Sequence, residues 1–331
     1  MQKRTWSEII AIAALAVLMV IVGSSCRTSR HAEPFHIAFN EWVGFAPFYL
    51  AKEKGYFGDL EVDFQFIALE GDKRAGLQAG RFQMICETMD MFQAGREAET
   101  YPGKLVFAID ESFGGDGVLA SSEIQAVTAL KGKTVVAEPG SASMFVLQYL
   151  LHKEGMTVKE LNIQDMNSSD AAAAFMAQKA DVAGTYEPYL TTALQKRPGS
   201  HVLVSSKDTP GLIVDVAIVD KQVLDRRNAD VRKVFEGWCR AMDYYKSDEE
   251  DAVSIMAKPF KLSPKEFKET ISGIRYFDLA RNHQFIGTQT VKGPIYDIFA
   301  TIGSILKEND LTKAVAPASD VIFPTIVTTA K

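Results

Sequence analysis

Hydrophobic and polar residues follow two alternating patterns along the chain. Short stretches rich in Val, Ile and Phe have the period of strands, and the segments between them have the period of amphipathic helices. In the first half, these patterns predict strands at residues 35–39, 60–67 and 82–86, and helices at 47–54 and 73–79. In the second half, they predict strands at 133–137, 161–166 and 181–185, and helices at 143–154 and 170–179. The two halves therefore repeat one order of elements.

Local signals mark the ends of several predicted helices. Gly55 and Gly155 supply the left-handed residue that commonly follows a helix. Two helices of the second half begin beside side chains that could accept hydrogen bonds from their free amides. These are Ser141 and Ser143 for the helix at 143–154, and Ser169 and Asp170 for the helix at 170–179. These signals support the helix assignments independently of the hydrophobic period.

The chain beyond residue 212 does not repeat the pattern a third time. A strand at 213–219 precedes predicted helices at 228–245, from 264 onward, and at 295–307. The economical arrangement has this part covering the first half, so that the chain crosses to a second lobe near 117–124 and returns near 208–215. We therefore expect an α/β protein with lobe I formed by residues 35–117 and 213–331, lobe II formed by residues 118–212, and a two-segment hinge.

Strands that alternate with helices are typical of a parallel-type sheet with helices on its faces. In such sheets, ligands bind beyond the carboxyl ends of the strands. The loops that follow Phe39, Cys86, Ala137 and Thr185 are therefore the expected ligand-binding loops.

Acidic side chains gather at these predicted strand ends, where Glu41, Glu87, Glu138 and Glu187 lie. A core would have to pair each buried carboxylate, so their convergence favours a ligand site. One or two of them could instead cap a helix or face solvent. For Glu138, a ligand contact and one of these structural roles are equally compatible with the sequence.

Aromatic and hydroxyl side chains accompany the glutamates. Trp42, Phe45 and Tyr186 offer flat faces to a ring or a cation, and the alternative for Trp42 is that it covers the core. Thr88 adds a hydroxyl beside Glu87. A predicted helix start offers free amides and hydroxyls at Ser141, Ala142 and Ser143. Two aspartates, Asp116 and Asp215, lie on the predicted crossings. The last two could either touch a ligand or hold the hinge.

The N-terminus has the layout of an export signal. Lys3 and Arg4 precede an apolar run at 9–22, and small residues then lead to Cys26. Cys26 resembles the lipid-modified cysteine of bacterial lipoproteins, although Gly23 departs from the aliphatic residue usual at its position. We expect a signal peptide at 1–26 and a tether at 27–34; the alternatives are ordinary cleavage or an uncleaved anchor.

Charge and cysteine usage exclude some classes of function. The chain has 331 residues and a formal net charge of -6, without the basic face that a nucleic acid partner would require. Neither the cysteines nor the five histidines have the spacing of a zinc site, and no metal or cofactor is expected. Cys86 and Cys239 are expected to be free and buried, with a single disulfide between them as the alternative.

Five blocks of sequence resemble those of the nitrate, sulfonate, taurine and thiamine-precursor binding proteins. The first block is the stretch from Glu41 to Phe57, and the others are residues 130–141, 170–175, 181–189 and 213–216. The resemblance implies a periplasmic-binding-protein fold of the second type, with ligand held between the lobes for an ABC permease and its ATPase. The expected ligand-binding residues are Glu41, Trp42, Gly44, Phe45, Glu87, Thr88, Asp116, Ser141, Ala142, Ser143, Tyr186, Glu187 and Asp215.

The same residues indicate which ligands the site favours, and they also allow the alternative that the protein is an enzyme. A site rich in carboxylates and aromatic rings favours a pyrimidine or an amine, whereas a sulfonate, taurine or nitrate could be held by helix amides and hydroxyls. An enzyme could use Glu87 and Glu187 as general acid and base, but the chain has no nucleophile elbow and no cofactor fingerprint. We expect a monomeric solute-binding protein that is tethered to a membrane by its lipid.

Overall fold

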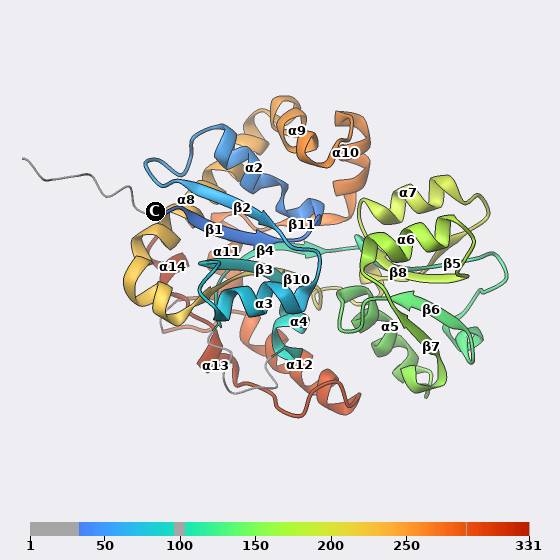
Figure 1. The fold of residues 1–331 in the computed structure, drawn as a ribbon. Coiled ribbons are helices and arrows are strands. Elements are labelled where there is room, and N and C mark those ends of the chain that lie inside the picture. The colour runs from blue at the N-terminus through green and yellow to red at the C-terminus, as the bar shows by residue number, and fades with distance from the viewer. Residues whose placement is uncertain (1–32, 96–102, 289, 331) are drawn as a thin grey trace, which may run out of the picture. The chain divides into compact units, whose positions relative to one another are not determined.

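The computed structural model describes residues 33–95, 103–288 and 290–330. The signal peptide, Cys26 and all but the last two residues of the expected tether lie outside this part. Residues from Phe35 onward form one compact unit, which contains two β-sheets with helices packed around each (Figure 1). We call the elements built on the six-stranded sheet lobe I and those built on the five-stranded sheet lobe II.

The sheet of lobe I has the strand order β11-β4-β10-β3-β1-β2. Its strands are β1 (Phe35–Phe39), β2 (Val62–Phe66), β3 (Met84–Thr88), β4 (Gly103–Ser112), β10 (Val214–Asp220) and β11 (Ile274–Tyr276). The first three run parallel, and β10 joins them antiparallel to both β3 and β4.

The helices of lobe I come from both ends of the chain, which explains how the C-terminal part covers the first half. Short 3-10 turns apart, they are α2 (Ala46–Glu53), α3 (Glu70–Gln78), α4 (Met89–Ala94), α8 (Lys221–Ser247), α9 (Glu249–Ala257), α10 (Pro264–Thr270), α11 (Leu279–Ile286), α12 (Ile295–Glu308), α13 (Ala318–Val321) and α14 (Thr325–Thr328). The early helix α2 packs against α8 and α9, and α4 packs against α12.

The sheet of lobe II has the order β7-β6-β8-β5-β9. Its strands are β5 (Asp116–Ala120), β6 (Thr134–Ala137), β7 (Asn162–Asp165), β8 (Val182–Tyr186) and β9 (His201–Ser205), and its helices are α5 (Ala142–Lys153), α6 (Ser168–Met176) and α7 (Tyr189–Lys196). Leu119, Val136, Phe175 and Ala183 belong to a separate small core under α6 and α7. Figure 1 shows these three helices around the second sheet.

The predicted strands and helices are present, with ends that differ by a few residues, but two details of the fold were predicted wrongly. Both sheets are mixed rather than parallel, because β4 and β10 in lobe I and β5 and β9 in lobe II run antiparallel to their neighbours. The first crossing lies between Ser112 and Asp116, earlier than the predicted 117–124, because β5 already belongs to the second sheet.

The helix caps were also predicted only in part. Ser141 caps α5 by accepting a hydrogen bond from the Met144 amide, whereas Ser143 lies inside the helix. Asn167 caps α6 in place of the predicted Ser169 and Asp170, because its side-chain oxygen accepts the Asp170 amide. An asparagine is as good a cap as serine or aspartate, so the local signal was ambiguous by a few residues.

Cys86 and Cys239 are free and buried, so the expected disulfide alternative is wrong. No helix within the described ranges is both long enough and apolar enough to cross a membrane. The longest, α8, has a non-helical residue at Arg227, which separates its first turns from the helix predicted at 228–245.

Candidate ligand cleft

A small cavity lies where the facing ends of the two sheets meet. Its volume is about 20 Å³, which is room for roughly one water molecule. Both lobes contribute its lining, which consists of Asn40, Trp42, Glu70, Thr88, Met91, Asp116, Glu138, Ser141, Ala142, Ser168, Tyr186 and Asp215. The Ser168 hydroxyl is buried and has no hydrogen-bond partner within the described part of the chain. The two lobes therefore meet closely around a small cavity with a largely polar lining.

Trp42 connects the two sides of this cavity. Its indole Nε1 donates to Asp110, at 3.3 Å from Oδ1 and 3.2 Å from Oδ2. Its ring meets the Tyr186 ring of lobe II edge-on, with 5.9 Å between centroids. Edge-to-face pairs of this kind add stability beyond the area that they bury, so the Trp42–Tyr186 contact favours the closed arrangement of the lobes.

Two ion pairs hold part of the acidic cluster within lobe I. Lys73 is fully buried, with its Nζ 2.6 Å from Glu70 Oε2, and it donates to the Cys86 carbonyl at 2.7 Å. Arg74 Nη1 lies 2.9 Å from Glu87 Oε2. Lys73 is therefore a buried cation within lobe I, held by Glu70 and the Cys86 carbonyl.

Four other carboxylates at the cleft, those of Asp110, Asp116, Glu138 and Asp215, have no ion-pair partner among the residues described. Burial, together with neighbouring carboxylates, raises the pKa of Asp110 to about 8 and the pKa of Asp116 to about 7, although a hydrogen bond to each carboxyl acts in the opposite direction. Burial and the nearby Glu70 raise the pKa of Glu138 to about 7. Burial, with Asp110 and Asp116 close by, raises the pKa of Asp215 well above its usual value.

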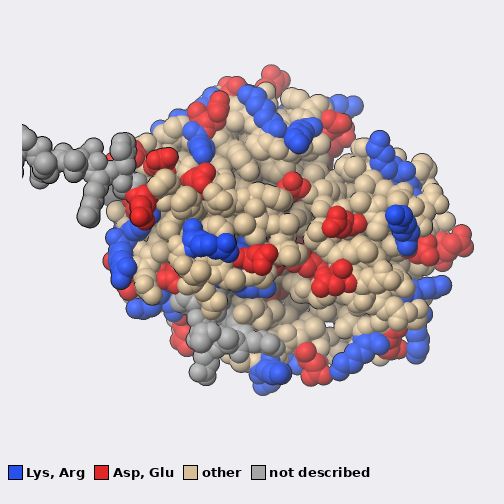
Figure 2. All heavy atoms as spheres, in the orientation of Figure 1, with Lys and Arg blue, Asp and Glu red and all other residues tan. Residues whose placement is uncertain are grey.

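Carboxyl groups without a cationic partner among the residues described are therefore concentrated where the lobes meet. Figure 2 shows acidic side chains gathered on the visible face along the boundary between the elements of the two sheets. A buried carboxylate without a partner is costly, and a ligand with positive charge would supply that partner. Within the residues described, no group of three or more His, Cys, Asp or Glu side chains is arranged to hold a metal ion.

The expected ligand-binding residues fall into two groups in the structure. Those that line the cavity are Trp42, Thr88, Asp116, Ser141, Ala142, Tyr186 and Asp215. Those outside its lining are Glu41, Gly44, Phe45, Glu87, Ser143 and Glu187. Gly44 and Ser143 still act on lining residues, since Gly44 lies against Trp42, and the Ser143 hydroxyl is 3.1 Å from that of Ser141.

The proposed acid and base pair, Glu87 and Glu187, is held by two separate sets of partners. Glu87 pairs with Arg74 in lobe I. Glu187 accepts hydrogen bonds from the Thr191 amide at 3.1 Å and hydroxyl at 2.7 Å, within α7 of lobe II. Burial raises the pKa of each carboxyl, and each carboxylate contacts partners from its own lobe.

Several lining residues were not predicted. Asn40 directly follows β1, and Glu70 begins α3 a few residues after β2. Both lie beyond the carboxyl ends of strands, so the expectation that ligands bind there could have found them. Ser168 is the first residue of α6 and directly precedes Ser169 and Asp170, which were predicted only as helix caps. Asp110, which holds Trp42, lies within β4, a strand that the polarity pattern did not predict.

Gly44→Ala is expected to displace the Trp42 indole. A Cβ at residue 44 would lie 2.1 Å from Trp42 Nε1 and 2.2 Å from Asp110 Oδ2, so the hydrogen bond between them could not persist. In ¹⁵N-labelled protein, the indole N–H resonance of Trp42 should shift markedly. Gly71→Ala is the control, because nothing lies within 4 Å of its added Cβ. An indole spectrum identical to that of the control would contradict the contact.

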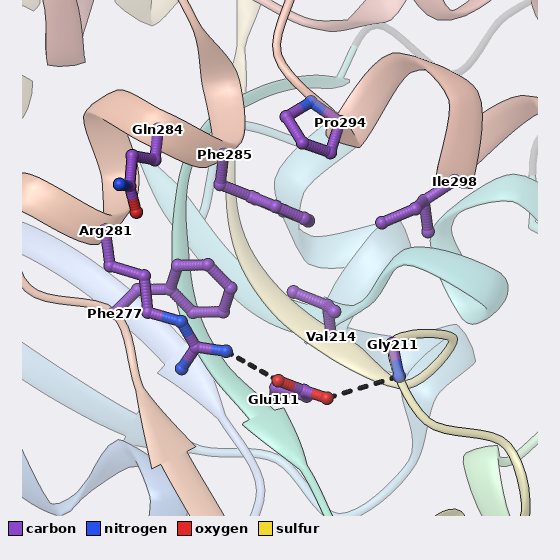
Figure 3. Close-up of a pocket in the computed structure, with 9 residues that line it drawn as sticks. All are labelled: Glu111, Gly211, Val214, Phe277, Arg281, Gln284, Phe285, Pro294 and Ile298. Carbon is purple, nitrogen blue, oxygen red and sulfur yellow. Dashed lines mark hydrogen bonds and ion pairs between the residues drawn. The ribbon is translucent and has the colours of Figure 1, made fainter.

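A second feature lies on the opposite side of β4, at the hinge. Glu111 points away from Asp110, because successive side chains of a strand face opposite ways. One carboxylate oxygen accepts the Gly211 amide of the returning crossing at 3.2 Å, and the other lies 2.5 Å from Arg281 of α11 (Figure 3). Glu111 thus ties the returning crossing to lobe I, beside a pocket of about 260 Å³.

Glu111→Ala is expected to lower the free energy of unfolding by about 1.5–3 kcal/mol, because hydrogen bonds to a charged group would be lost from the hinge. Denaturant unfolding would measure the change. Gln284→Ala is the control, since Gln284 lines the same pocket on its exposed side. Equal stability of the two variants would show that Glu111 does not hold the returning crossing.

The chain forms part of one sheet, crosses to form a second and returns to the first, and a polar cavity lies between the two. This arrangement is that of the periplasmic-binding-protein fold, and comparison with solved structures gives the same fold. The alkanesulfonate-binding protein SsuA from Xanthomonas axonopodis pv. citri, bound to MOPS, superimposes with a TM-score of 0.72 at 15% identity over 88% of this chain and 99% of that one. The nitrate-binding protein NrtA from Synechocystis PCC 6803 gives a TM-score of 0.69 at 13% identity over 88% and 86%. The predicted fold is confirmed.

The family is shown by its sequence model. The model described as NMT1/THI5 like matches residues 42–252, and the chain belongs to that family. A Brucella abortus protein whose name proposes a binding function is 25% identical over 47% of this chain and 50% of its own, so this chain spans about half of that relative. A Bacillus subtilis protein whose name proposes aliphatic sulfonate binding is 24% identical over 75% of this chain and 76% of its own.

Proposed function

We propose that this protein is the extracytoplasmic solute-binding component of an ABC importer and that it captures an organic cation between its lobes. The observation that carries the proposal is the set of carboxylates without cationic partners, Asp116 and Glu138 from lobe II and Asp110 and Asp215 from lobe I. Trp42 and Tyr186 supply ring faces at the same place. A cation bound there would replace the missing partners from both sides.

Capture requires only that the solute bind the closed arrangement better than an open one. Asp215 and Trp42 contact it from lobe I, and Asp116 and Tyr186 contact it from lobe II. The solute leaves unchanged, since the carboxylates outside the cavity are committed to Arg74 and Thr191. A permease with its ATPase then receives it.

The family and the fold support the transport role, and the N-terminal sequence supports export. Under this proposal, residues 1–26 direct export, Cys26 carries the lipid, and the protein works as a monomer held at the membrane.

The competing ligand class is an anion, which the names of the sulfonate- and nitrate-binding relatives favour. Ser141 at the start of α5 would be its natural contact. Any anion beside Ser141 would also face Glu138 and Asp116, and the cation is the better match to the charge of the cleft.

A thermal-shift series on the full-length chain in detergent tests this choice. Butylamine and an aminomethylpyrimidine are expected to raise the melting temperature, because a ligand at about 100 times its Kd stabilises by about 2.7 kcal/mol. Butanesulfonate, taurine and nitrate are expected to leave the melting temperature unchanged. Stabilisation by the sulfonates alone would refute the cation, and mass spectrometry showing conversion of the bound amine would refute the non-enzymatic role.

A further inference from the structure

A larger cavity lies outside the acidic centre and is also built by both lobes. Its volume is about 410 Å³. Lobe I contributes Tyr49, Phe66 and Phe260, and lobe II contributes Pro188 and Tyr189. We call this cavity the outer pocket. Its ring-rich lining differs from the carboxylate lining of the inner cavity.

Most rings of the outer pocket contact another aromatic side chain, and Phe66 is the exposed one. Tyr49 meets Phe260 edge-on at 6.2 Å between centroids, and Tyr189 lies 5.6 Å from Tyr186. Phe66, at the end of β2, is 53% exposed. A large apolar side chain left this exposed beside a ligand cleft is free to cover an incoming ring.

Asn40 joins the outer pocket to the inner cavity, because it lines both. Its amide nitrogen donates to Glu70 at 3.1 Å, and its side-chain oxygen accepts the Trp42 amide at 3.1 Å. Asn40 is therefore part of the wall between the two spaces, and two residues of the inner cavity hold its side chain. A single molecule that passes Asn40 would occupy both.

The sizes of the two spaces point to a solute with two parts. The inner cavity, at about 20 Å³, matches a small charged group, whereas the outer pocket, at about 410 Å³, has room for a ring. The exposed rim of the outer pocket carries one acidic and one basic side chain, Glu41 and Lys261, so its charge is balanced. A neutral aromatic ring fits this lining better than a second charge.

We propose that the outer pocket binds an aromatic ring of the same solute whose ammonium group occupies the inner cavity. This inference rests on the proposed capture of a cation and narrows the solute class to arylalkylamines. Contact of the ring with Phe66 on one side and Tyr189 on the other would add a second bridge between the lobes, beyond the bridge formed at the inner carboxylates.

Titration calorimetry of the full-length chain in detergent with two matched series tests the outer pocket. One series runs from methylamine to butylamine, and the other carries a terminal phenyl group, from benzylamine to 4-phenylbutylamine. We expect both series to bind, with the phenyl group at its best chain length lowering Kd by about tenfold or more, the gain typical of a well-packed ring.

Phe66→Ala and Tyr189→Ala should each remove most of the phenyl gain and leave the Kd of butylamine unchanged. Leu69→Ala is the control, because Leu69 is also an exposed apolar residue, 44% accessible, but lies outside the lining of the outer pocket. If the phenyl group gives no gain in affinity, or if the gain persists in both ring variants, the proposed ring site in the outer pocket is wrong. Binding of the alkylamines would in that case still support the inner site. Failure of both amine series overturns the cation itself, and the inference with it.

Discussion

Asp116→Asn is expected to raise the thermal stability of the unliganded protein while it weakens amine binding by at least about tenfold. The Asp116 carboxyl is 5% exposed, and burial raises its pKa to about 7. An amide of the same shape removes a buried charge without a cationic partner, which favours the closed state. It also removes a charge-assisted contact to the solute, and such contacts contribute roughly 1.5–3 kcal/mol.

Opposite signs of the two effects distinguish a ligand-binding aspartate from a structural one. A structural Asp116 would lose stability on substitution, and its binding would change little. Melting temperature and Kd for butylamine should be measured on the same preparation. Glu123→Gln, at an exposed position of lobe II, is the matched control and should change neither quantity. Unaltered amine affinity in the Asp116 variant would remove this residue from the site.

The unliganded protein is expected to lose stability as the pH rises from about 5 to about 8. The folded-state pKa is raised to about 8 for Asp110 and to about 7 for Asp116 and Glu138, and the pKa of Asp215 is raised well above its usual value, whereas unfolded carboxyls titrate near 4. The folded protein therefore binds more protons in this window. Stability is fully present below about pH 4 and falls as the pH passes through the raised values.

Amine binding should oppose this loss, because the cation favours the ionised carboxylates. The rise in melting temperature caused by butylamine is therefore expected to grow between pH 5 and pH 8. Carboxyls with a lowered pKa, such as Asp59 and Asp251, titrate below this window and do not reverse the trend. Melting curves across the range test the sign, and the double variant Asp110→Asn with Asp116→Asn should flatten the slope. A melting temperature that rises steadily to pH 8 would contradict the assignment.

The periodic elements could be predicted because their patterns are local. The helix at Ala46–Glu53 and the strand at Thr134–Ala137 each have the hydrophobic period and end signals of their class. The strand β4 was not predicted, because a strand buried on both faces has a continuous run of apolar residues instead of an alternation. With β4 absent, Asp110 and the hinge residue Glu111 had no place in the predicted site.

Contacts between distant residues explain the remaining differences. Lys73 has the sequence context of an exposed helix, and only the approach of the Cys86 carbonyl and Glu70 makes its burial possible. Glu187 directly follows a strand, as a ligand-binding residue would. Its carboxylate instead accepts a hydrogen bond from the hydroxyl of Thr191, four positions later. A strand-end rule finds the correct edge of the sheet but does not decide which way each side chain turns.

The crystal structure of the full-length protein with its best-binding amine tests the central claim most directly. The account predicts the ammonium nitrogen within hydrogen-bond distance of Asp116 or Glu138 from lobe II and of Asp215 or Asp110 from lobe I, with Trp42 against the solute. An amine bound elsewhere on the surface, with the space between these carboxylates filled only by water, would contradict it.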